Sequence, residues 1–283
     1  MKTYQYRLLN VFAESTFGGN PLCVFTDARG LSDTQMQSLA LQFNLSETTF
    51  LLPSTIASAA VRIFTPTFEM AFAGHPTLGS AHVVRDALKT GDAVTLEMKA
   101  GVIPVSAAGD NWTLTANKPT SRDAEMSPTA IAAMLRLDEA DVLNGARWIN
   151  TGSEQFIVPL ASADAVMRVK PDAALLKSIA SNINRSMVYV FAPDIERGHN
   201  NLRARFFFMQ HDSVVEDPAT GSATANLGGW MLHHGRNPCD FQIEQGEVIS
   251  RPSHLKLDVS VEGMIFVGGR VLEIGRGAVG LEV

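Results

Sequence analysis

The strongest constraint on the fold is a pattern that the chain carries twice. Residues 74–81 read GHPTLGSA and residues 216–223 read EDPATGSA, so Pro-x-x-Gly-Ser-Ala recurs 142 positions later in a chain of 283 residues. His75 precedes the first proline, and Asp217 precedes the second. A repeat at half the chain length predicts two copies of one structural unit.

The similarity continues upstream of this motif. NLSETTFLLP (44–53) aligns with NRSMVYVFAP (184–193) at an offset of 140, and Arg62 aligns with Arg205 at an offset of 143. Both halves therefore read Asn-x-Ser, a strand, a proline, an arginine-bearing strand and the repeated motif. Because these matches keep their order at nearly one offset, we interpret them as a duplicated domain and not as chance similarity between amphipathic segments.

The two motif segments predict helices enclosed by strands. Pro76 suits the first turn of a helix, because its missing N–H would have no intrahelical partner there. The Gly-Ser-Ala stretch that follows in each copy carries little side-chain volume. Neighbouring backbone can therefore approach such a helix closely, which is typical of a central helix and not of a surface helix.

Capping residues predict where helices begin. Ser32 and Gln35 have the spacing of a capping box at the start of a helix that ends near residue 43. Ser127 followed by Pro128 predicts a second helix start. Asp217 has the side chain of a good N-cap for the second motif helix, a structural role that it would combine with any role at the site.

A duplicated domain also predicts where a ligand binds. Ligand sites favour domain interfaces, and a helix start offers unpaired N–H groups and a partial positive charge. We therefore expect the two motif helices to begin at one cleft and to hold an anion such as a carboxylate. Gly74, Gly221 and Ser222 would leave the backbone accessible there.

The two copies differ at one acid/base position. Glu47 in the first copy aligns with Met187 in the second. Removing and returning a proton on opposite faces of a carbon needs two acid/base groups, whereas moving a proton along one face needs one. The asymmetry therefore favours isomerisation over epimerisation. Burial beside Phe50 and Phe64 would raise the pKa of Glu47 and suit it to proton transfer at neutral pH.

Four stretches resemble the phenazine-biosynthesis isomerase (PhzF-like) family over nearly the whole chain: ESTFGGNPLCVF, LSETTF, FAGHPTLGSAHV and EDPATGSATANLGGW. The resemblance implies the α+β fold of diaminopimelate epimerase, with two pseudo-symmetric domains that each wrap a β-sheet or barrel around a central helix. We expect residues 1–118 and 271–283 to form the first domain and residues 119–270 to form the second. The active site would lie in the cleft between them.

The same resemblance implies roles for individual residues. The glutamate of the SET motif, Glu47, would be the proton shuttle, while His75 and Asp217 would assist at the substrate, and Gly221-Ser222 would cradle its carboxylate. The predicted substrate-binding residues are Asn20, Ser46, Gly74, Gly221 and Ser222. Epimerase relatives carry cysteines at the two helix starts. This chain has His75 and Asp217 there, which argues against a two-thiol racemase.

The predicted function is a cofactor-independent isomerase acting on a small carboxylate-bearing substrate. The family member with a known reaction isomerises dihydro-hydroxyanthranilate without a cofactor, so the resemblance implies a mechanism better than a substrate. Two alternatives stay open at this point. One is an amino-acid-type racemase or epimerase, whose second base could only be Asp217 or His75. The other is a non-catalytic protein that binds small acids.

Composition narrows the possible partners. The net charge of −6 and the lack of basic runs argue against nucleic acid, and no apolar run reaches the roughly 20 residues of a membrane helix. Two distant cysteines, Cys23 and Cys239, predict reduced thiols and a cytoplasmic protein. His211, Asp212 and Glu216 lack the tight histidine spacing of zinc sites, so no metal is predicted. The resemblance implies a homodimer.

Overall fold

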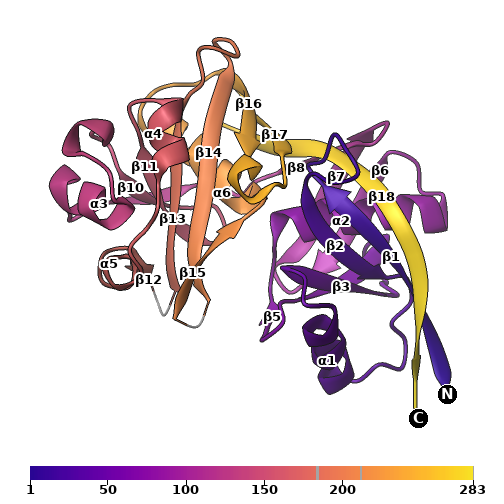
Figure 1. The fold of residues 1–283 in the computed structure, drawn as a ribbon. Helices are drawn as coiled ribbons and strands as arrows, with labels where there is room; N and C mark the ends of the chain where they lie inside the picture. The colour runs from indigo at the N-terminus through magenta and orange to yellow at the C-terminus, as the bar shows by residue number, and fades with distance from the viewer. Residues whose placement is uncertain (183–184, 211, 283) are drawn as a thin grey trace. The chain divides into compact units, whose positions relative to one another are not determined.

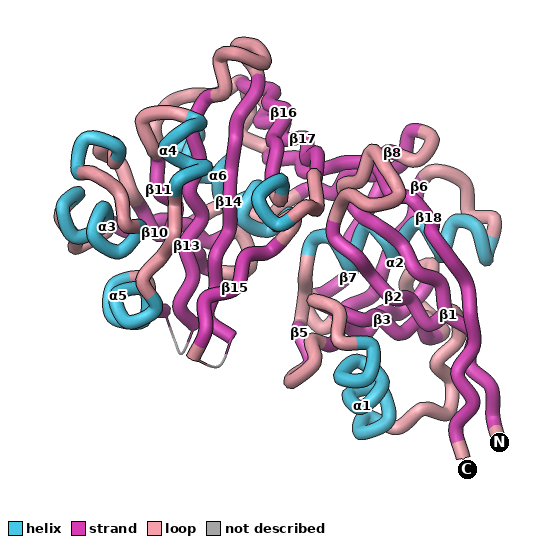
Figure 2. The backbone as a smooth tube through the Cα atoms, in the orientation of Figure 1, coloured by secondary structure: helices cyan, strands magenta, loops and turns pink. Residues whose placement is uncertain are grey.

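A computed structural model describes residues 1–182, 185–210 and 212–282. Two compact units make up the fold, Met1–Thr115 with Gly268–Val283 (the first unit) and Ala116–Val267 (the second unit). The boundaries expected from the sequence lie three residues later at each crossing. Helices and strands are mixed in both units, as Figure 2 shows, so the fold is α+β. Asn184 of the repeat and His211 of the rejected metal cluster lie outside the described residues.

The first unit is a sheet with one long helix against it. Its antiparallel pairs include β1–β2, β3–β4 and β6–β7, and its parallel pairs are β2–β3 and β4–β6. Its strands are β1 (Lys2–Val11), β2 (Asn20–Phe25), β3 (Glu47–Leu52), β4 (Ala59–Phe64), β5 (Glu69–Met70), β6 (Ala93–Met98), β7 (Gly101–Ala108), β8 (Asn111–Thr115) and most of β18 (Ile265–Leu281). Its helices are α1 (Asp33–Phe43) and α2 (Gly74–Leu88).

The second unit repeats that order of pairings. Its antiparallel pairs include β10–β11, β13–β14 and β16–β17, and its parallel pairs are β11–β13 and β14–β16. Its strands are β9 (Thr120–Asp123), β10 (Arg147–Asn150), β11 (Glu154–Pro159), β12 (Ser181–Asn182), β13 (Arg185–Pro193), β14 (Asn201–Gln210), β15 (Ser213–Asp217), β16 (Cys239–Gln245) and β17 (Ser253–Val259). Its helices are α3 (Pro128–Leu135), α4 (Ala163–Arg168), α5 (Ala173–Ile179) and α6 (Gly221–His233), with short 3₁₀ turns at Glu139–Asp141 and Glu247–Ile249.

Strand register shows which residues of the two units occupy equivalent positions. Phe50 is paired with Arg62 in the first unit, and Val190 is paired with Arg205 in the second. These pairs have the offsets of 140 and 143 seen in the sequence. Met187 therefore occupies in β13 the place that Glu47 occupies in β3.

Arg62 and Arg205 each form an ion pair with a glutamate of the neighbouring strand. Arg62 makes a two-point ion pair with Glu69, with N···O distances of 2.7 and 2.8 Å, and its guanidinium lies 5.1 Å from the centre of the Phe64 ring. Arg205 pairs in the same way with Glu216, at 3.0 and 2.7 Å, and lies over the ring of the phenylalanine two positions later. Both arginines thus tie neighbouring strands together.

The prediction of enclosed central helices is confirmed. α2 is buried continuously from Gly74 to Ala81, and most of α6 is buried as well. A Cβ placed on Gly79 would lie 2.4 Å from Leu22 Cδ2, and one placed on Gly228 would lie 2.7 Å from a methyl group of Ile265. Only a helix with small residues fits at these contacts, because real Cβ atoms do not approach so closely.

Two of the predicted helix starts are confirmed and one is wrong. Ser32 and Gln35 form the capping box of α1, and Ser127 caps α3 with its side chain. Asp217 does not cap α6. It is the last residue of β15, where it pairs with Phe206, and the N-cap position of α6 is Thr220. Because β15 extends to Asp217, the helix begins later in the chain, at Gly221.

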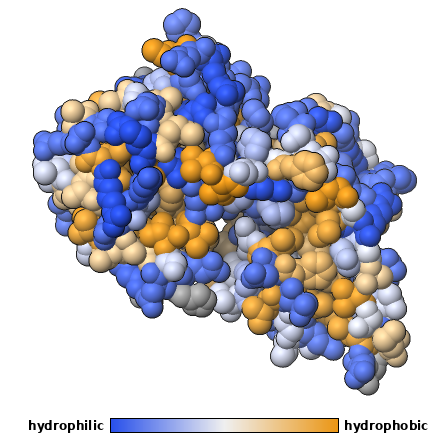
Figure 3. Space-filling view, viewed as in Figure 1, coloured by the Kyte–Doolittle hydropathy of each residue, from blue (hydrophilic) through white to orange (hydrophobic). Residues whose placement is uncertain are grey.

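The surface combines polar residues with scattered apolar ones. Figure 3 shows hydrophobic and hydrophilic residues interspersed on the face in view. Within the described residues, no helix is long and apolar enough to cross a membrane.

Candidate active site

The first unit brings two of the predicted catalytic residues together. Glu47 is the first residue of β3, and His75 is the second residue of α2. Nε2 of His75 lies 3.3 Å from Oε2 of Glu47. Their side chains are 6% and 15% exposed, so the contact lies under the surface while the carboxylate keeps some access to solvent.

Burial determines the charge of the histidine. It lowers the pKa of His75 to about 3, because a charged imidazole would lose its hydration there. The ring is therefore neutral at pH 7, and its contact with Glu47 is not an ion pair despite the short distance. The two atoms are in contact but do not meet the geometry of a hydrogen bond, so the neutral ring does not compensate the charge of the carboxylate.

Aromatic side chains form the interior on the face of β3 opposite to Glu47. Phe50 and Phe64 are buried and meet edge to face, with ring centres 5.5 Å apart, and Phe25 stacks on Phe50 at 4.9 Å. These rings pack against Met36 and Leu39 of α1, whereas Glu47 faces His75 of α2, so the predicted burial of Glu47 beside Phe50 and Phe64 is wrong. A raised pKa for Glu47 stays a prediction.

Three predicted substrate-binding residues lie at or next to the first residues of β2, β3 and α2. Asn20 begins β2 and is fully buried, and β2 runs parallel to β3, with Leu22 opposite Glu47. Ser46 is half-buried and directly precedes Glu47, and Gly74 opens α2 beside His75. The chain before Asn20 turns at Gly19, whose φ of +72° and lack of space for a Cβ require glycine.

The second unit holds Asp217 in a short loop before α6. A carboxylate oxygen of Asp217 accepts a hydrogen bond from the hydroxyl of Thr220. Gln245, at the end of β16, fastens the same loop. Its Nε2 donates to the Asp217 carbonyl at 2.9 Å and to Thr220 Oγ1 at 3.0 Å, and its Oε1 accepts from the Thr220 N–H at 3.3 Å. The side-chain amide of Gln245 thus satisfies polar groups of Asp217 and Thr220 that lie outside the helix.

Gly221 and Ser222 follow as the first two residues of α6. Gly221 is buried, whereas Ser222 is half-buried. Gln155 Nε2 donates to Ser222 Oγ at 3.0 Å. Gln155 and the Gln245 contact were both missed in the sequence, because each lies on a strand far from the motif that it touches.

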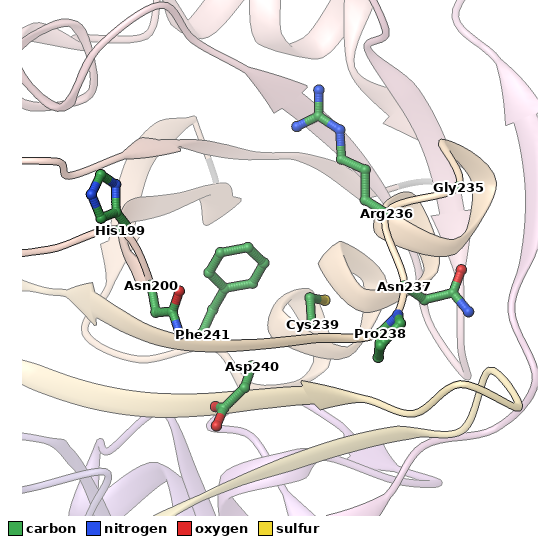
Figure 4. A pocket seen from close by; sticks show the side chains of 9 residues that line it. All are labelled: His199, Asn200, Gly235, Arg236, Asn237, Pro238, Cys239, Asp240 and Phe241. Atoms are coloured by element: carbon green, nitrogen blue, oxygen red, sulfur yellow. The ribbon is translucent and has the colours of Figure 1, made fainter.

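One hollow in the second unit holds none of the predicted residues. It has a volume of about 580 Å³ and is lined by His199, Asn200, Gly235, Arg236, Asn237, Pro238, Cys239, Asp240 and Phe241. In Figure 4 the polar side chains point in different directions and do not converge. Burial and the nearby Asp258 and Asp240 carboxylates raise the pKa of Cys239 to about 11, so its thiol is not a nucleophile at pH 7.

Among the described residues, no group of three or more histidine, cysteine or acidic side chains is placed to hold a metal ion. Both cysteines are free thiols in the structure. Cys23 is fully buried in β2.

Comparison with known proteins places the chain in a family. Residues 9–271 match the family PhzC-PhzF, described as phenazine biosynthesis-like protein. The chain belongs to the PhzC-PhzF family. Its relatives in this family include an uncharacterized isomerase of Pasteurella multocida, 40% identical over 279 residues, which span 97% of this chain and 93% of that protein.

Other members give the family a reaction class and a solved fold. The trans-2,3-dihydro-3-hydroxyanthranilate isomerase of Pseudomonas chlororaphis is 34% identical over 290 residues, or 98% of this chain and 99% of that protein. The crystal structure of a PhzF-family phenazine biosynthesis protein of Bacillus anthracis matches with a TM-score of 0.87 at 25% identity, covering 99% and 100% of the two chains. This PhzC-PhzF protein is therefore an isomerase with the PhzF fold.

Proposed function

We propose that the chain isomerises a small carboxylate-bearing substrate without a cofactor, with Glu47 as its single proton carrier. One observation carries this proposal: a neutral, buried His75 lies 3.3 Å from Glu47, while an apolar residue, Met187, stands at the corresponding place in the second unit. One half of the fold thus has a carboxylate beside a neutral imidazole, and the other half has no carboxylate at the corresponding position.

The proposed reaction needs only one such group. The Glu47 carboxylate takes a proton from one substrate carbon and returns it to another carbon on the same face, so the enzyme ends each cycle in its starting state. His75 lies beside the carboxylate and stays neutral. Asp217, Gly221 and Ser222 are proposed to bind the substrate, as are Asn20, Ser46 and Gly74.

Two relatives suggest a first compound to test. The Pseudomonas chlororaphis and Pseudomonas fluorescens relatives are named for trans-2,3-dihydro-3-hydroxyanthranilate, which carries a carboxylate on a six-membered ring. We propose a substrate of this chemical class for the present chain. Homodimer formation and a cytoplasmic location stay predictions from the sequence.

The racemase alternative is less well supported by the geometry. It needs a second base, and a pKa of about 3 makes His75 a poor one at neutral pH. Asp217 is the other candidate, and its carboxylate already accepts a hydrogen bond from Thr220.

Solvent exchange tests the proposal. The full chain is incubated in D₂O with trans-2,3-dihydro-3-hydroxyanthranilate, and deuterium at the ring carbons is followed by NMR. We expect exchange with the unmodified chain, a loss of at least about 100-fold in Glu47→Gln, the range of a lost acid/base group, and retained ligand binding. Glu97→Gln, another half-buried carboxylate of the first unit, is the matched control and should exchange normally. Unimpaired exchange in Glu47→Gln would refute the role of this residue.

A further inference from the structure

A line of buried polar side chains runs through the second unit to Ser222. Thr151 donates its backbone N–H and its hydroxyl to Asn226 Oδ1, both at 2.8 Å. Asn226 Nδ2 donates to the Ser153 carbonyl at 2.8 Å and to Gln155 Oε1 at 2.7 Å. Gln155 Nε2 then donates to Ser222 Oγ at 3.0 Å. Asn226 and Gln155 are 0% and 3% exposed.

The backbone fixes the direction of every bond in this line. The oxygen and nitrogen of a side-chain amide are hard to tell apart by shape, so their assignment rests on their partners. A backbone N–H can only donate, which makes the atom of Asn226 facing Thr151 the oxygen. Its nitrogen must then face Gln155 Oε1, and the nitrogen of Gln155 must face Ser222.

These hydrogen-bond directions determine the role of the Ser222 hydroxyl. Ser222 Oγ accepts the bond from Gln155, so its own hydrogen points elsewhere. Within the described residues, Ser222 Oγ has no other hydrogen bond. The hydroxyl is left as a donor, and Ser222 is half-buried at the start of α6.

The first unit shows that the fold does not need this network. Register places Leu22 where the second unit has Gln155, and the repeat places Val84 where it has Asn226. Leu22 and Val84 are fully buried and apolar. Ser80, which corresponds to Ser222, turns inward and donates to Thr49 Oγ1 at 3.0 Å. Burying two amides is costly unless they are hydrogen-bonded, so the second unit keeps polar groups where the first uses hydrocarbon.

We propose that Gln155 and Asn226 are positioning residues that lock the Ser222 hydroxyl as a donor, so that this position selects a hydrogen-bond acceptor, namely the carboxylate of the substrate. The inference rests on the proposed function for the choice of ligand. The direction of the hydroxyl follows from the network itself.

Neutron diffraction of the unmodified chain in D₂O locates the deuterium atoms, and so shows the direction of the hydrogen bond between Gln155 and Ser222 without any ligand. We expect deuterium on Gln155 Nε2 to point at Ser222 Oγ and the hydroxyl deuterium to point away from Gln155. A hydroxyl deuterium lying between Ser222 Oγ and Gln155 would overturn the proposal.

Binding measurements test the selection. Calorimetry compares anthranilate with 2-aminobenzamide, which has nearly the same shape but replaces the carboxylate by an amide. We expect the unmodified chain to prefer anthranilate. Ser222→Ala should reduce this preference about tenfold, the effect of one hydrogen bond to a charged group. Gln155→Leu should reduce it about threefold, since an unlocked hydroxyl has three staggered orientations.

The double variant separates positioning from packing. If Gln155 acts through Ser222, Gln155→Leu should change nothing further once Ser222→Ala is present. Gln155→Met, an unbranched side chain of similar length, repeats the test if the leucine variant does not fold. An equal loss in both backgrounds, no loss in either, or no saturable anthranilate binding by the unmodified chain would each overturn the proposal.

Failure of the proposed function would look different. Glu47→Gln should keep the preference for anthranilate and lose only deuterium exchange. A chain that shows the preference but never exchanges protons would refute the isomerase mechanism and leave the Ser222 assignment intact.

Discussion

His75 and Glu47 come from different elements of the first unit and meet with Nε2 and Oε2 3.3 Å apart. The contact joins the second residue of the central helix to the first residue of a strand. Because the helix is enclosed and cannot shift without moving the strands around it, His75 lies at a fixed position beside the carboxylate.

The buried His75 predicts a specific loss of stability in acid. Its pKa of about 3 in the folded chain is below the value of about 6.5 expected when unfolded, so below pH 6.5 the unfolded chain binds a proton that the folded chain does not. Its contribution is complete above pH 6.5 and falls by about 1.4 kcal/mol per pH unit between there and pH 3. His75→Gln should flatten the curve of unfolding free energy against pH in this window, measured by urea denaturation. An unchanged slope would contradict the burial of the ring.

Gln245, which hydrogen-bonds the segment between β15 and α6, corresponds to a methionine in the first unit. Register places Met98 of β6 at the same position in the first unit, where it accepts from Thr77 Oγ1 at 3.6 Å. Gln245→Met removes three hydrogen bonds from the loop that carries Asp217, and we expect deuterium exchange to slow about tenfold, the cost of a misplaced group. Gln242→Met, the same change at an exposed site of the same strand, should have no effect. Full activity in Gln245→Met would show that the loop holds itself.

Gly79 of α2 predicts a local packing penalty. An added methyl group would meet Leu22 Cδ2 at 2.4 Å, Val11 at 3.1 Å and Leu9 at 3.3 Å. Gly79→Ala should therefore destabilise the chain by about 1–3 kcal/mol, the usual range for overpacking. Gly275→Ala, which meets nothing within 4 Å, is the matched control and should stay close to the unmodified chain in thermal denaturation. Equal melting of the two variants would contradict the enclosed helix.

Arg205 predicts a large structural effect. Besides its pair with Glu216, it donates to carbonyls that include Val166 at 3.1 Å and Val169 at 2.9 Å. Arg205→Ala would leave a buried carboxylate unpaired, at a cost of about 3–5 kcal/mol in urea denaturation. Arg29→Ala breaks an exposed pair and should leave the free energy of unfolding nearly unchanged. A small effect of Arg205→Ala would mean that Glu216 finds solvent or another partner.

The elements predicted best are those whose signal is local. The capping box of Ser32 and Gln35 and the Ser127-Pro128 start need only a few neighbouring residues, and both are confirmed. The central helices were recognised because small residues mark close backbone contact. Asp217 was assigned wrongly as an N-cap, because β15 was not foreseen and no side-chain pattern separates a strand end from a helix cap there.

The polar line to Ser222 could not have been found from spacing. Gln155 and Asn226 lie 71 positions apart, and the packing of α6 against β11 brings them together. One signal was present: Asn226 is a polar residue inside a helix predicted to be enclosed, and such a group must find partners.

The strand β18 gives the chain an unusual order of assembly. Residues 268–283, at the very end of the sequence, belong to the first unit, where β18 pairs along β1 from Lys2 to Val11. On the ribosome, every residue of the second unit is therefore synthesised before the first unit has its last strand. Until β18 is synthesised, strand β1 of the unit that carries Glu47 and His75 lacks its partner along one edge.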